Sequence, residues 1–127
     1  MQIRCVWEHH GNDTLLHSEN FIGAFSRGET CEIAIQKMPF EIASYLQWKG
    51  EEVPDLLEPL IVQEKESDLC ISDADSDVLF EAERKPLTVE EYGALKALAL
   101  KSAQDFLALY EAIPDRNKSC LPERKTF

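Results

Sequence analysis

The chain has 127 residues and is 44% hydrophobic, which is enough for one domain with a core of its own. Its 24 Asp and Glu residues outnumber its 13 Lys and Arg residues, giving a formal net charge of −11. So acidic a surface repels phosphate backbones, and no basic cluster offsets it. The charge therefore suits a small basic protein partner, or solubility alone, rather than nucleic acid.

The first ten residues, MQIRCVWEHH, lack the long apolar run of a signal peptide. No stretch reaches the roughly 18 consecutive apolar residues of a membrane-spanning helix. The cysteines are widely spaced and form no C-x-x-C pair, which is typical of reduced thiols in an intracellular protein. They are Cys5, Cys31, Cys70 and Cys120. We therefore expect a cytoplasmic location and no contact with a membrane.

Residues 2–10 and 14–22 are predicted to form two antiparallel strands joined by a tight turn. Polar and apolar side chains alternate in the first run, as in a half-buried strand, except at Val6. The alternating apolar residues are Ile3, Cys5 and Trp7. Gly11-Asn12 suits a two-residue turn because both residue types tolerate a positive φ.

The three histidines, His9, His10 and His17, are candidate zinc ligands. Adjacent residues of a strand point to opposite faces, so His9 and His10 cannot share a metal. Closing the hairpin at the predicted turn places His9 opposite Thr14 and His17 opposite Val6. Since the chain has no helical H-x-x-x-H pair either, we expect surface histidines rather than a metal site.

The segment FIGAFSRGET, residues 21–30, combines two glycines, two aromatic residues and an arginine between a strand and a helix. Such a loop could recognise a partner. It could equally be a structural turn in which glycine supplies unusual backbone angles. The candidate binding residues are Gly23, Phe25, Arg27, Gly28 and Thr30. Trp7, Tyr45 and Trp48 suit either a core or an interface.

From Thr30 the apolar residues recur every three or four positions, which predicts a helix near 30–49. Its apolar face consists of Ala34, Met38, Ile42 and Tyr45/Leu46. Thr30 suits the N-cap, and Gly50 closes the helix. Pro39 lies inside it, and because proline removes one backbone hydrogen bond we expect a kink there.

Three short runs then favour strands: residues 60–66, 69–72 and 78–83. Between the last two lies SDADSD, in which Asp73, Asp75 and Asp77 alternate as at the opening of a calcium loop. An EF-hand loop needs Gly at its sixth position and Glu at its twelfth, but these positions hold Val78 and Arg84. We therefore expect an acidic turn between two strands and no metal.

No motif in the sequence predicts catalysis. There is neither a Walker loop nor a G-x-G-x-x-G motif. Cys5 lies near the histidines in sequence, but a nucleophile also needs a base in contact with it. Glu8 with Asp73 or Asp75 would form a carboxylate site only if separate strands brought them together. We expect no enzyme activity and no cofactor.

Residues 88–114 are predicted to form a long amphipathic helix. Thr88 and Glu91 form a capping box, in which each side chain bonds to the backbone amide of the other residue. The apolar face consists of Tyr92, Leu95, Ala99, Ala103, Phe106, Tyr110 and Ile113. This face needs a cover, either the domain at 1–87 or a second copy in a homodimer. Residues 115–127 are polar and are expected to form a flexible tail.

The run GAFSRGETCEIAIQKMPFEIASYLQW resembles the strand-to-helix segment of HicB-like domains, in which a glycine-containing turn leads through Thr or Ser into an E-x-A helix. The residues that carry this resemblance are Gly23, Gly28, Thr30, Glu32 and Ala34. It covers about the first half of the chain. It implies a fold similar to a degenerate RNase H unit, with a hairpin-led sheet and one packed helix. It also implies a role in binding and neutralising a small basic toxin, often as a dimer.

HicB antitoxins commonly append a DNA-binding element, whereas this chain continues in one long helix. Residues 84–119 look like the opening helix of a DinB-like domain, whose metal-binding histidines come from several helices. Those helices are missing here, so no metal residue carries over.

We therefore expect an α+β fold: a small antiparallel sheet of β-β-β-α-β order packed by the kinked helix, plus the long C-terminal helix. The expected function is a non-catalytic protein- or ligand-binding module. Two alternatives stay open. One is the N-terminal regulatory part of a DinB-type metal-dependent enzyme that lacks its metal-binding helices, and the other is an orphan structural domain.

Overall fold

The computed structural model describes residues 1–73 and 75–118, which fall into two compact units. The first unit is Met1–Arg84, and the second begins at Lys85. The first contains, in chain order, β1 (Gln2–His10), β2 (Asp13–Ser18), β3 (Phe25–Gly28), α1 (Cys31–Lys49) and β4 (Glu58–Glu66), followed by the 3-10 turns η1 (Ile71–Asp73) and η2 (Glu81–Arg84).

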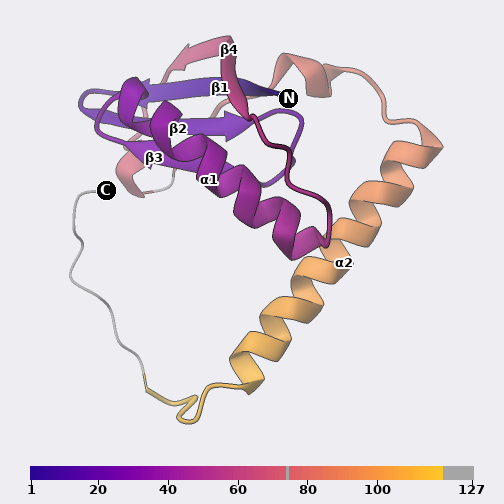
Figure 1. Ribbon diagram of the computed structural model, residues 1–127. Helices are drawn as coiled ribbons and strands as arrows, with labels where there is room; N and C mark the ends of the chain where they lie inside the picture. Colours follow the sequence, from indigo (N-terminus) through magenta and orange to yellow (C-terminus); the bar gives the residue numbers. More distant parts are fainter. Residues whose placement is uncertain (74, 119–127) are drawn as a thin grey trace. The chain divides into compact units, whose positions relative to one another are not determined.

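The four strands form one mixed sheet in the order β3-β2-β1-β4 (Figure 1). β1 pairs with β2, and β2 with β3, in antiparallel fashion, whereas β1 and β4 run parallel. The α+β class and the β-β-β-α-β order are confirmed, but the expectation of a wholly antiparallel sheet is wrong for the β1–β4 pair. The reason is α1: a helical crossover returns the chain so that β4 runs in the direction of β3 and β1.

The β1–β2 hairpin has the predicted register. The pairs include His9 with Thr14 and His17 with Val6. Gly11 in the turn has a φ of 56°, as the turn requires. β2 is shorter than the strand predicted at 14–22, because the chain leaves the sheet after Ser18 and forms a loop before β3.

One face of the sheet packs against α1 (Figure 1). The buried residues of this core are Ile3, Cys5, Leu16, Ala24, Ala34, Met38, Ile42 and Leu46. The four from α1 are spaced by four residues, as the predicted apolar stripe requires.

The ends of α1 are those that the sequence predicts. Thr30 is the N-cap, and its hydroxyl accepts a hydrogen bond from the backbone N–H of Ile33 at 3.3 Å. Gly50 ends the helix in the left-handed conformation, with a φ of 77°. Pro39 lies inside the helix, which continues past it to Lys49.

The opposite face of the sheet is covered by residues 67–73 and 75–84, which we call the strap. Val6 and Leu15 lie on this face, and both are buried, as is Ile71 of the strap. Val6 breaks the alternation of β1 because β1 is covered on both faces rather than on one.

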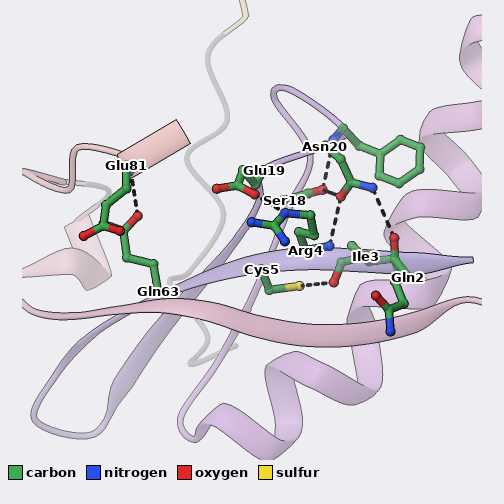
Figure 2. A network of polar contacts seen from close by, with 10 residues as sticks. Gln2, Ile3, Arg4, Cys5, Ser18, Glu19, Asn20, Gln63 and Glu81 are labelled. Carbon is green, nitrogen blue, oxygen red and sulfur yellow. Dashed lines mark hydrogen bonds and ion pairs between the residues drawn. The ribbon is translucent and has the colours of Figure 1, made fainter. Parts of the chain in front are cut away.

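The strands predicted at 69–72 and 78–83 are wrong, because this part of the chain forms η1 and η2 instead. The strap bonds to a side chain of β4 rather than to a strand backbone. The Gln63 amide nitrogen donates to the carbonyl of Leu79 at 2.9 Å. Its amide oxygen accepts from the backbone N–H of Glu81, also at 2.9 Å (Figure 2). These contacts satisfy backbone groups that a β-ladder would otherwise use.

The second unit contains α2 (Val89–Glu111), which begins at the predicted capping box. Thr88 and Glu91 each accept a hydrogen bond from the other's backbone N–H, at 3.1 and 2.8 Å. The described residues of this unit include no second helix or strand that could cover the apolar side chains of α2. Most of the tail predicted at 115–127 lies outside the described residues, which end at 118.

Neither α1 nor α2, the two α-helices within the described ranges, combines the length and the apolar character that crossing a membrane requires.

Gly28→Ala is expected to lower the free energy of unfolding of the first unit by about 1–3 kcal/mol. An added Cβ would lie 2.9 Å from two side-chain carbons of Ile33 and 3.0 Å from the carbonyl oxygen of Thr30. The check is urea denaturation followed by tryptophan fluorescence. Gly93→Ala in α2, where an added Cβ meets nothing within 4 Å, is the matched control and should not destabilise the protein. Wild-type stability for Gly28→Ala would contradict this close packing.

Burial raises the pKa of the Cys5 thiol to about 11. The thiolate is the reactive form, so Cys5 should resist alkylation near neutral pH, where it stays protonated. We expect iodoacetamide to modify the exposed Cys70 of the native protein, and Cys5 only after unfolding. Peptide mass spectrometry measures both sites, and equal rates at Cys5 and Cys70 in the native protein would refute the expectation.

Candidate functional site

The loop between β2 and β3 is held against the start of β1 by Asn20 (Figure 2). The Asn20 side-chain oxygen accepts from the backbone N–H of Arg4 at 2.9 Å, and its nitrogen donates to the carbonyl of Gln2 at 3.1 Å. Arg4 also forms an ion pair with Glu19. The chain is thereby fixed just before Gly23, whose φ of 92° turns it into β3.

A groove lies between β3, an edge strand of the sheet, and α1, and we call it the β3–α1 groove. Its volume is about 540 Å³, which is within the usual range of ligand sites. Residues 23–27 form its wall on the side of β3. Its wall on the side of α1 consists of Lys37, Glu41, Ser44, Tyr45 and Trp48.

Two aromatic side chains form part of the α1 wall. The ring centroids of Tyr45 and Trp48 are 5.7 Å apart, and Tyr45 also meets Phe21 edge-on at 6.1 Å. The Tyr45 hydroxyl donates to the carbonyl of Ile22 at 3.0 Å, and burial raises the pKa of this hydroxyl. The neutral hydroxyl therefore ties the loop before β3 to α1 and fixes the orientation of the ring.

The charged residues of the groove differ in what they contact. Arg27 donates through Nη2 to the carbonyl of Ile71 at 2.7 Å, which ties the strap to β3. The Lys37 ammonium donates to the carbonyl of Arg27 at 2.9 Å and so covers a backbone acceptor of the edge strand. Glu41 is exposed and makes no hydrogen bond or ion pair within the described part of the chain.

Three of the five predicted binding residues, Gly23, Phe25 and Arg27, line the groove, and Phe25 is 48% exposed. The other two, Gly28 and Thr30, do not line it and instead form the close junction between β3 and α1. The structural-turn interpretation thus describes Gly28 and Thr30, and recognition through the other three residues stays a prediction.

The α1 wall of the groove is not singled out by the sequence analysis. Lys37, Glu41, Ser44 and Trp48 recur every three or four residues beside the apolar stripe, which is the signal that could have indicated a shared helix face. Tyr45 and Trp48 suit a core or an interface in sequence, and here both line the groove.

A second polar cluster surrounds Glu8 of β1, beneath the strap. The Glu8 side chain is fully buried. Its carboxylate accepts from His17 Nε2 at 3.1 Å, the Ser76 hydroxyl at 2.6 Å and the backbone N–H of Asp77 at 3.3 Å. The His17 ring also lies 5.5 Å from that of Phe80, between centroids. A buried carboxylate requires such donors, so the strap is fastened to the sheet at Glu8.

The prediction of surface histidines is wrong for His9 and His17, whose side chains are only 22% and 20% exposed. Each pairs with a glutamate, His9 with Glu64 of β4 at 2.9 Å and His17 with Glu8. The pattern of β1 and β2 does not indicate the His9 pair, because β4 supplies its carboxylate. Glu8 lies on β1, diagonally across the hairpin from His17, so the register does place that pair on one face.

The Glu8 cluster does not have the geometry of an activated serine. Ser76 donates to Glu8, whereas activation requires a histidine that accepts the hydroxyl proton. Among residues 1–73 and 75–118, no group of three or more His, Cys, Asp or Glu side chains could hold a metal ion. The D-x-D-x-D run includes Ala74, which lies outside the described residues.

Comparison with protein-family models, curated proteins and solved structures gave no match.

Glu8→Ala is expected to lower the free energy of unfolding by about 2–4 kcal/mol, because three donors lose their acceptor and a cavity forms. Glu64→Ala is the matched control: Glu64 also pairs with a histidine, but its side chain is 57% exposed. Glu64→Ala should change the free energy of unfolding by no more than about 0.5 kcal/mol. Urea denaturation of both variants at one pH measures the difference, and equal losses would mean that Glu8 does not fasten the strap.

Proposed function

We propose that the first unit is a non-catalytic module that binds a small basic protein through the β3–α1 groove, in the manner of an HicB-like antitoxin domain. The observation that carries this proposal is a groove of ligand-site size beside the open edge of β3. The β-β-β-α-β order and the single helix packed on the sheet are the features that the HicB resemblance implies.

The edge of β3 supports binding of an extended segment. β3 pairs with β2 on one side and is the last strand of the sheet on the other. Extended peptides commonly add to a sheet at such an edge through backbone hydrogen bonds. The Lys37 ammonium donates to the carbonyl of Arg27 at this edge. Because the lysine side chain is flexible, a backbone N–H of a partner strand can replace it as the donor to that carbonyl.

The distribution of charge supports a basic partner. Residues 1–84 contain 18 Asp and Glu against 6 Lys and Arg, whereas residues 85–127 contain 6 against 7. The first unit thus carries a net charge of −12 and the remainder +1. A field of this sign attracts a basic protein before contact and increases the rate of association, more strongly at low salt.

We place this interaction in the cytoplasm. Among the described residues Cys5, Cys31 and Cys70 are free thiols, as is usual in a reducing compartment. Binding of this kind requires no cofactor and no catalytic residue.

Phe25→Ala should weaken partner binding about tenfold or more, because its side chain on the edge strand β3 is 48% exposed and would contact a strand added at this edge, on the face of His17. Phe40→Ala is the matched control: Phe40 is 75% exposed on α1 but does not line the groove. The measurement is affinity purification of each variant from the native host, with mass spectrometry of the proteins that co-elute and titration of the purified pair.

Support requires a stoichiometric basic protein that binds wild type and Phe40→Ala, is lost with Phe25→Ala and binds more weakly as salt increases. Recovery of no such protein, or equal capture by all three chains, would reject the proposal.

A further inference from the structure

We infer that Glu41, Tyr45 and Trp48 form a receptor for one arginine or lysine side chain of the bound segment, an inference that rests on the proposed function of the groove. All three residues line the β3–α1 groove. They occupy positions i, i+4 and i+7 of α1 and so share one helix face. Aromatic rings attract a cation through their faces, and a nearby carboxylate adds a charge-assisted hydrogen bond.

The aromatic part of this receptor is already ordered. The planes of Tyr45 and Trp48 are inclined at 57°, and the Tyr45 hydroxyl is bonded to Ile22. Rings fixed before binding lose little conformational entropy when a ligand arrives. Tyr45 also takes a cation within the chain, since the Lys49 ammonium lies 5.7 Å from its ring centroid while pairing with Glu51 at 2.6 Å.

The other charged residues of the groove do not oppose a basic ligand at this point. The Arg27 side chain is only 15% exposed, and its Nη2 donates to Ile71 and lies 3.9 Å from the carboxylate of Asp13. The Lys37 ammonium is bonded to the carbonyl of Arg27. Glu41 is therefore the charged group of the groove that is exposed to an incoming side chain.

The geometry of β3 also predicts the spacing of the bound segment. The Ser26 hydroxyl donates to the carbonyl of Ala34 at 2.8 Å, so Ser26 faces α1. A strand added to β3 would likewise direct every second side chain toward α1, about 7 Å apart. We therefore expect a cationic residue followed or preceded, two positions away, by an apolar residue.

The test is selection of a random dodecapeptide library, displayed on phage, on the immobilised full chain. Enriched peptides should share an arginine or lysine with an apolar residue two positions away. The tightest peptide, labelled with a fluorophore, then gives a Kd by anisotropy for each variant. Glu41→Gln should weaken binding about threefold to tenfold, and Trp48→Leu should also weaken it.

Glu52→Gln is the matched control, because Glu52 is exposed, does not line the groove and loses the same charge. It should bind as wild type does. Replacing the basic residue of the peptide by alanine should weaken binding to wild type but have little further effect with Glu41→Gln, as a double-mutant cycle shows for interacting groups.

Enriched peptides without a common cation, or a Kd unchanged by Glu41→Gln, would overturn the receptor. The proposed function would survive that result if Phe25→Ala still abolished binding of the same peptides. Enrichment of no peptide would overturn the receptor as well, and capture of the folded basic partner would then decide the function independently.

Discussion

β1 is hydrogen-bonded along both edges and covered on both faces, and the positions of the other elements of the first unit follow from this. β2 and β4 pair with its two edges, α1 covers one face, and the strap covers the other. A strand in this position can hold a charged side chain only where a covering element supplies donors. Glu8 is such a side chain, and Ser76 and Asp77 of the strap bond to it, so that one buried carboxylate fixes where the strap crosses the sheet.

With β1 at the centre, β3 is left as an edge strand, and three side-chain hydrogen bonds hold it and the loop before it in place. Ser26 bonds to the backbone of α1, Arg27 bonds to the strap, and Tyr45 of α1 bonds to the loop that precedes β3. Both walls of the β3–α1 groove are thus set by side chains that are ordered without a ligand. This arrangement favours binding to a preformed site, which avoids much of the entropy cost of ordering a loop.

The chemistry of the first unit suits the binding module that we propose. The buried carboxylate of Glu8 has its hydrogen bonds satisfied by the protein itself, whereas the groove combines an open strand edge, two aromatic rings and an exposed glutamate. The negative charge of the chain is concentrated in the same unit, and the part that contains α2 is almost neutral. Under the proposed function, long-range attraction and local recognition would favour the same class of partner, a basic protein that offers an extended segment.

The sequence by itself determined the features that depend on residues close along the chain. These are the turn and register of the β1–β2 hairpin, the caps of α1 at Thr30 and Gly50, and the capping box of α2. Each rests on hydrogen bonds or periodicity within a few residues. It also indicated half of the groove, through Phe25 and its neighbours. Only the tertiary structure decided that β4 runs parallel to β1, that the strap covers the sheet instead of extending it, and that α1 supplies the second wall of the groove. The physical reason is distance along the chain: Ser76 bonds to a carboxylate 68 residues away, and no local pattern can specify a contact that exists only after both segments have packed on the same sheet.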